Sequence, residues 1–137
     1  MGPFGDADRI IDAVIKTLAE DERVVFAYLY GSLLSEGRGN DIDIAVYPNR
    51  RLDAYSLAVD LKIEMHKKTA IPPDAFDIRL LNELIDKGDI FGLLYLRNVL
   101  EKGKILVDKE PDVRVDFLMR YGLRFRECEG LIQEVLA

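Results

Sequence analysis

The chain has 137 residues, of which 49% are hydrophobic and 32% charged, and this composition predicts one folded domain over residues 1–137. The net charge of −6 weighs against a nucleic-acid binder, and the single Cys128 and single His66 exclude an internal disulfide and a Cys/His zinc site. The sequence has no signal-peptide pattern and no run of about 18 apolar residues, so we expect a cytoplasmic protein without a membrane span.

The first part of the chain predicts a helix followed by a central strand. Asp6 or Asp8 can cap a helix that runs to about Glu20, with apolar residues at helical spacing. The strand at 24–30 is apolar on both faces apart from its tyrosine hydroxyls, which is typical of the middle of a sheet.

The next elements predict two further strands separated by a helix. We expect a strand at about 41–47, a helix at about 52–69 that ends before Pro72, and a strand at about 75–81. Strands that alternate with helices favour an α/β (α+β) fold with a mixed central sheet of about four strands flanked by helices.

The remaining residues predict a broken helix from Leu84 to Glu101, a glycine cap at Gly103 and a short strand at 104–107. A last helix is expected at about 112–136. Its apolar residues cover more than one face, which predicts a homo- or hetero-oligomer contact through this helix.

Two carboxylates stand out at the start of the second strand. Residues i and i+2 of a strand share a face roughly 6.6 Å apart, so Asp41 and Asp43 project together while Ile42 and Ile44 face the core. Two neighbouring carboxylates repel each other unless a cation lies between them, and carboxylate oxygens suit Mg²⁺. The spacing therefore predicts a magnesium site.

The dipeptide Gly31-Ser32 ends the first strand and predicts a phosphate-binding turn. Glycine allows the backbone to approach a ligand closely, and free backbone N–H groups with a serine hydroxyl can hold phosphate oxygens. One helical turn at 33–35 would point its positive end at the same place.

A hydrophobic strand, Gly-Ser, a loop and Asp-x-Asp on the next strand resemble the nucleotidyltransferase superfamily of DNA polymerase beta. The chain's size resembles the minimal nucleotidyltransferases, whose bacterial and archaeal members are often antitoxins of HEPN-type toxins. The run Phe76-Asp77-Ile78-Arg79-Leu80-Leu81-Asn82 is similar to the family's later strand and matches Asp77 to its third carboxylate. The similarity covers about residues 8–110, the core of the expected domain.

The resemblance implies a polymerase beta-like palm that uses ATP and two Mg²⁺ ions. Asp41, Asp43 and Asp77 would be the metal ligands and catalytic residues, and Gly31 and Ser32 would bind the nucleotide. The expected reaction transfers AMP from ATP to a hydroxyl of a partner protein, with a tyrosine of a HEPN-type toxin as the acceptor that the resemblance implies.

The loop between Ser32 and Asp41 departs from the family pattern. It has eight residues, 33–40, where the family commonly has about ten and often an Ala-Arg-Gly near its start. This departure bears on how the phosphates of the nucleotide are held. It favours an alternative, a non-catalytic antitoxin that inhibits its partner by binding.

Simpler interpretations stay open for the individual residues. Asp41 and Asp43 can form a solvated turn, Asp77 can pair with Arg79, and Ser32 can satisfy a turn. The candidate triphosphate contacts, each also interpretable as a solvated charge, are Arg38, Arg51, Lys62 and Lys67. A small-molecule nucleotidyltransferase is a third functional alternative, although such enzymes usually carry a further helical domain.

Overall fold

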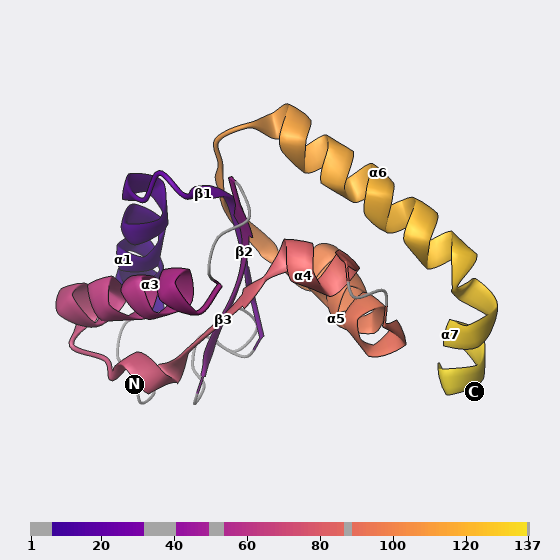
Figure 1. The fold of residues 1–137 in the computed structure, drawn as a ribbon. Coiled ribbons are helices and arrows are strands. Elements are labelled where there is room, and N and C mark those ends of the chain that lie inside the picture. The colour runs from indigo at the N-terminus through magenta and orange to yellow at the C-terminus, as the bar shows by residue number, and fades with distance from the viewer. Residues whose placement is uncertain (1–6, 32–40, 50–53, 87–88, 137) are drawn as a thin grey trace.

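The computed structural model describes residues 7–31, 41–49, 54–86 and 89–136, which form a four-stranded sheet and its covering helices (Figure 1). The elements in chain order are α1 (Ala7–Glu20), β1 (Val24–Tyr30), β2 (Ile42–Pro48), α3 (Ala54–Thr69), the 3-10 turn η1 (Pro73–Ala75), β3 (Phe76–Leu80), α4 (Leu81–Asp86), α5 (Ile90–Lys102), β4 (Lys104–Asp108), α6 (Pro111–Glu127) and α7 (Glu129–Leu136).

The strands lie in the order β3-β2-β1-β4. β1 is antiparallel to both of its neighbours, whereas β2 and β3 are parallel and are connected through α3. The sheet is therefore mixed, has four strands and places β1 in its interior, which confirms the predicted fold class.

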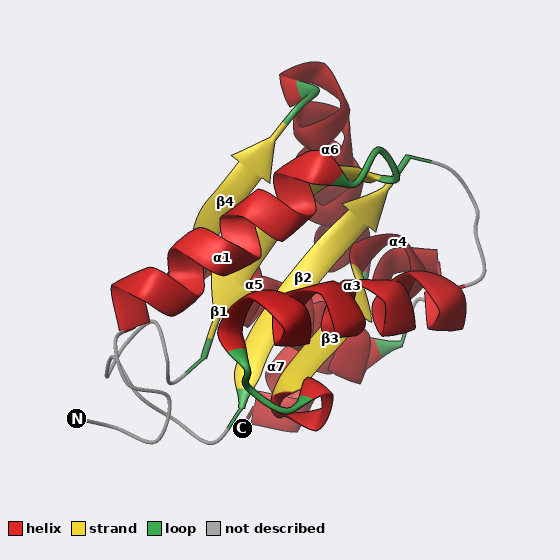
Figure 2. Cartoon of the chain, turned by 90° about the vertical axis from the view of Figure 1, so that its left-hand side faces the viewer, coloured by secondary structure: helices red, strands yellow, loops and turns green. Residues whose placement is uncertain are grey.

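Two helical layers cover the sheet on opposite faces (Figure 2). α1 and α3 lie over one face, and α4, α5 and the C-terminal helices lie over the other. The first core cluster includes Ile10, Leu18, Ile44, Leu61 and Met65, all at most 1% exposed. The second includes Phe26, Ala45, Leu93, Leu96 and Phe117, all 0% exposed.

The helix predicted over Leu84 to Glu101 is broken, as expected, between α4 and α5. Asp89 caps α5, because its side chain accepts hydrogen bonds from the backbone N–H groups of Phe91 and Gly92. The end of α5 has a different geometry from the expected cap. Gly103 is extended, with φ −75°, and the space for its Cβ is filled by the carbonyl oxygens of Val99 and Leu29.

The single helix predicted at 112–136 is wrong. α6 ends at Glu127 and α7 begins at Glu129, because Cys128 leaves the helical conformation while its N–H still donates to the carbonyls of Arg124 and Phe125. The change of direction brings Ile132, 1% exposed, into the core against the α5 side of the sheet. The apolar residues keep a helical spacing on both sides of Cys128, so the sequence pattern does not show the break or the burial of Ile132.

The other predicted boundaries agree with the structure within two residues where both ends are described. The start of the helix predicted at 52–69 and the helical turn predicted at 33–35 lie outside the described residues. None of the helices among the described residues combines the length and the apolar composition that a membrane-spanning helix requires.

Candidate active site

Asp43 on β2 and Asp77 on β3 lie opposite each other in the parallel strand pair. Both side chains point to the α5 face of the sheet, because each strand alternates and Ile42, Ile44 and Ile78 face the other core. The alternation noticed in the sequence therefore brings together two of the three predicted carboxylates, which are 34 residues apart in the chain.

The neighbourhood of Asp43 disfavours its charged form. Its side chain is half-buried, and the pKa of Asp43 is raised to about 6 by burial, by the charge of Asp77 and a hydrogen bond with it, and by the charge of Asp41. Arg79 acts in the opposite direction. Asp41 is exposed and comes directly before β2. A cation at this place would relieve the repulsion.

Gly31 brings the backbone against Asp43. It follows β1, whose last residue Tyr30 pairs with Asp43, and it has φ +96°. A Cβ at this position would overlap Oδ2 of Asp43, so only glycine fits both the conformation and the space. Ser32, the other predicted phosphate ligand, lies outside the described residues together with the loop through Asn40.

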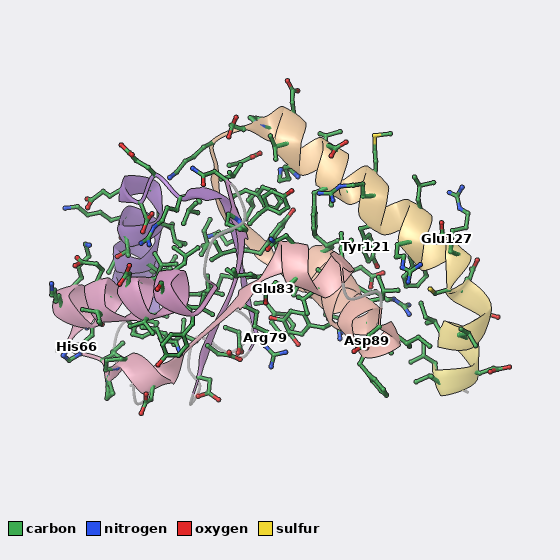
Figure 3. The ribbon with its side chains drawn as sticks, viewed as in Figure 1. His66, Arg79, Glu83, Asp89, Tyr121 and Glu127 are labelled. Atoms are coloured by element: carbon green, nitrogen blue, oxygen red, sulfur yellow. The ribbon has the colours of Figure 1, made fainter. Side chains whose placement is uncertain are left out.

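A guanidinium and two tyrosines border the carboxylates. Arg79 Nε lies 3.6 Å from Oδ2 of Asp77, and its guanidinium carbon lies 4.8 Å from the centroid of the Tyr95 ring on α5. Tyr95 in turn meets Tyr30 edge to face, with centroids 5.5 Å apart. Figure 3 shows Arg79 beside β3, on the side of the sheet that faces α5.

The sequence interpretation considered Arg79 only as an ion-pair partner and did not single out Tyr95. The predicted alternation of β3 placed Arg79 on the same face as Asp77 but gave Arg79 no role toward a ligand. No signal in the sequence identifies Tyr95, whose position depends on how α5 packs. Burial raises the pKa of Tyr95 to about 12, so its hydroxyl stays protonated at neutral pH.

The residues fit a divalent cation in part. Asp43 and Asp77 offer oxygen ligands in contact, next to a backbone that leaves no room for a side chain, and Mg²⁺ commonly takes one or two carboxylates with substrate phosphates. No group of three His, Cys, Asp or Glu residues among those described is close enough to hold a metal. The structure thus assembles Asp43 with Asp77 and leaves Asp41 at the margin.

Other residues singled out in the sequence lie elsewhere. Lys62 and Lys67 belong to α3, on the opposite face of the sheet, and Lys67 pairs with Glu64 at 3.2 Å. His66 Nδ1 lies 2.9 Å from the carbonyl oxygen of Ile71, a contact that holds the end of α3. Arg38 and Arg51 lie outside the described residues.

A separate cavity of about 600 Å³ lies between α5, α6 and α7. Its lining includes Arg97, Tyr121, Phe125 and Ile132, and contains none of the candidate site residues.

The chain matches the family model described as Polymerase beta, Nucleotidyltransferase over residues 12–112. The chain belongs to this family. The match contains Gly31, Asp41, Asp43 and Asp77, so the carboxylate pair lies within the nucleotidyltransferase domain.

No curated protein matches the sequence. Among solved structures the domain is similar to a chain of a tri-AMPylated Shewanella oneidensis HEPN toxin in complex with an MNT antitoxin, with 21% identity, a TM-score of 0.60 and coverage of 96% of this chain and 99% of that one. It is also similar to a chain of the MntA–HepT toxin–antitoxin (21%, 0.57, 93% and 97%) and of a toxin–antitoxin with AMP-PNP (22%, 0.62, 93% and 98%). At these identities the likeness establishes a shared fold.

Proposed function

We propose that this nucleotidyltransferase domain transfers AMP from ATP to a hydroxyl of a partner protein, and that it acts as an antitoxin that adenylylates a HEPN-type toxin. The observation that carries the proposal is the contact of Asp43 with Asp77 beside Gly31, in a domain of this family. The toxin–antitoxin neighbours, one with AMPylated toxin and one with AMP-PNP, support the choice of nucleotide and partner.

The first task of the site is to hold the triphosphate. Gly31 lets the backbone approach the phosphates, and the Ser32 hydroxyl is proposed to donate to a phosphate oxygen. Arg79 adds a cation on the same face. Its side chain is 50% exposed, so donors not directed at Asp77 remain open to a phosphate oxygen.

Asp41, Asp43 and Asp77 are the proposed ligands of two Mg²⁺ ions. When bound, Mg²⁺ supplies charge neutralisation at the triphosphate and lowers the pKa of the acceptor hydroxyl. The raised pKa of Asp43 is consistent with carboxylates arranged for a cation, since desolvation and like charges cost free energy without one.

In the proposed transfer the acceptor hydroxyl oxygen forms a bond to the α-phosphorus of ATP, and the bond from that phosphorus to the pyrophosphate oxygen breaks. Asp77 is proposed to take the hydroxyl proton, because its side chain is 45% exposed and can be reached from solvent. Pyrophosphate leaves from the Gly31 side of the site, and the partner keeps the AMP group.

One observation favours a second function, inhibition of the partner by binding alone. Asp43 and Asp77 are in contact, but no third carboxylate completes a metal cluster in the described part of the chain. The shortened loop at 33–40 points in the same direction.

The deciding experiment measures the intact mass of a HEPN-type toxin that forms a complex with this protein. The toxin is incubated with this protein, ATP and Mg²⁺, and the matched control is the Asp41→Asn/Asp43→Asn double variant. We expect a gain of one or more AMP units with the wild type and none with the variant. An unchanged mass, with a complex that the variant forms equally well, would establish the binding function instead.

A further inference from the structure

The outer face of α6 is an apolar surface that no described part of the chain covers. Val115, Met119 and Leu123 are 49%, 64% and 59% exposed and recur every four residues, so they form one stripe. Phe117, on the opposite side of the same helix, is 0% exposed. The helix thus has an inner face for the sheet and a second face that is free.

The residues of this face are arranged symmetrically about Met119. Val115 and Leu123 lie four positions before and after it, and Asp112 and Arg126, both exposed, lie seven positions before and after it. At 100° per residue all of them fall on the side away from Phe117. The apolar residues are matched across the centre, whereas the charges are opposite.

We propose that α6 pairs antiparallel with α6 of a second copy of this chain, about a two-fold axis at Met119. In that arrangement Val115 meets Leu123 of the second copy, and Asp112 meets its Arg126. The two-fold axis repeats each contact, so one helix surface provides both halves of the interface.

The charges at the two ends of the stripe indicate that the partner of this face is a second copy of the chain. An antiparallel pair sets an acid against a base at both ends, whereas a parallel pair would set like charges together. Neither Asp112 nor Arg126 makes an ion pair with any residue that the structure describes. Gly122 lies between the stripe and the cavity of α5, α6 and α7, which Arg126 also borders, and a Cβ at Gly122 would meet no described atom of another element within 4 Å.

The inner contacts of α6 hold this face in place. Arg114 bonds Asp108 at 2.8 Å, Arg120 donates to the hydroxyl of Tyr47 at 2.9 Å, and Phe117 packs on Phe26 with centroids 5.6 Å apart. The stripe is therefore presented on a fixed helix, and pairing does not require the helix to order first.

The carboxylate site stays open in this arrangement. α6 runs along the edge of the molecule, well away from Arg79, which marks the site in Figure 3. One helix against one helix buries less than the about 1,200 Å² of standard interfaces, so the dimer is expected to dissociate on dilution.

Analytical ultracentrifugation of the full chain over a range of concentrations tests the pairing. We expect a reversible monomer–dimer equilibrium. Asp112→Arg sets two bases opposite each other, and Arg126→Asp sets two acids opposite each other, so each variant should weaken the dimer at least about tenfold. Lys16→Asp on α1, which changes the charge by the same amount as Arg126→Asp at an exposed site on the other face of the sheet, should not.

An equimolar mixture of the two single variants is the decisive sample. Every facing pair is then again opposite in charge, so dimers should reappear as heterodimers, and the Asp112→Arg/Arg126→Asp chain should dimerise by itself. Circular dichroism confirms that each variant is folded. A wild-type chain that stays monomeric at all concentrations, or a mixture no more associated than its components, overturns the proposal.

Discussion

Arg79 lies with its guanidinium carbon 4.8 Å from the centre of the Tyr95 ring while its Nε faces Asp77 at 3.6 Å. One contact holds the side chain through the ring face, and the other through charge. The contact with the ring predicts that Tyr95 positions Arg79 through its aromatic ring and not through its hydroxyl.

Replacing Tyr95 with leucine should weaken nucleotide binding about twofold to fivefold, the equivalent of one cation–π contact of about 0.5–1 kcal/mol. Tyr95→Phe keeps the ring and should bind like the wild type. Arg79→Lys should lose more than Tyr95→Leu, because a lysine lacks the planar fork. Calorimetric titration with AMP-PNP and Mg²⁺ gives the affinities. Equal losses for the phenylalanine and leucine variants would assign the effect to the hydroxyl.

Asp43 should destabilise the protein when no metal is present. Its folded pKa of about 6 lies above the usual 3.8, so the folded protein favours the protonated carboxyl. The stability that the protonated form contributes is fully present below pH 3.8 and is lost as the pH rises through 6. Asp43→Asn should therefore raise the free energy of unfolding at pH 7.5 by about 1 kcal/mol. Urea unfolding at pH 7.5 and pH 5 should show the difference shrinking at the lower pH.

Magnesium should make the wild type more stable than the Asp43→Asn variant, the reverse of their order without metal. Added Mg²⁺ binds the folded wild type and stabilises it by linkage, whereas the Asp43→Asn variant lacks a charged ligand and should respond weakly. The melting temperature with and without Mg²⁺ measures the effect. An equal rise in both proteins would place the metal away from Asp43.

Asp21 should have the opposite dependence on pH. Its pKa is lowered, chiefly by a hydrogen bond from the Arg23 side chain at 2.7 Å, and Arg23 also reaches Asp60 of α3 at 3.0 Å. The stability that Asp21 contributes is present above its unfolded pKa and is lost as the pH falls through its lowered folded pKa. Asp21→Asn should cost about 1 kcal/mol at neutral pH, and less in acid. A loss that persists unchanged at pH 3 would contradict this account.

Gly31→Ala should harm the site and the fold together. The φ of +96° and the nearby Oδ2 of Asp43 leave no place for a methyl group, so we expect a loss of about 1–3 kcal/mol in unfolding free energy and weaker nucleotide binding. Gly122→Ala is the matched control. Its Cβ meets open space within a helix, so it should stabilise the protein by about 0.5–1 kcal/mol. Thermal unfolding of both variants separates the local clash from the general effect of the substitution.

The interior position of β1 and the faces of Asp43 and Asp77 could be predicted from the sequence, because a continuous apolar run and a period of two residues are visible in the chain itself. The helix over 112–136 and the role of Tyr95 could not. The break at Cys128 depends on burying Ile132 against the α5 side, and the ring of Tyr95 reaches Arg79 through the rotation of α5 against the sheet. Both features are contacts between elements that are distant in the chain. The local sequence pattern is the same whether or not these contacts form, so it cannot predict them.

The expected glycine cap at Gly103 illustrates a related limit. The position is correct, but the residue is extended, and glycine is needed there because the carbonyls of Val99 and Leu29 occupy the space of a side chain. The sequence shows that a glycine is present. Only the packing shows that the position requires the absence of a Cβ and not the left-handed conformation that glycine also permits.

The register of β2 against β3 also determines the net charge of the site. Asp43 faces Asp77 and Ala45 faces Arg79, so two acids lie together at the edge of the sheet. A shift of one residue would turn Asp43 toward the hydrophobic core, and a shift of two in one direction would set it against Arg79 in a neutral pair. A backbone hydrogen-bond ladder therefore decides whether this edge attracts a cation, and any change that loosens the strand pairing alters the chemistry before it unfolds the protein.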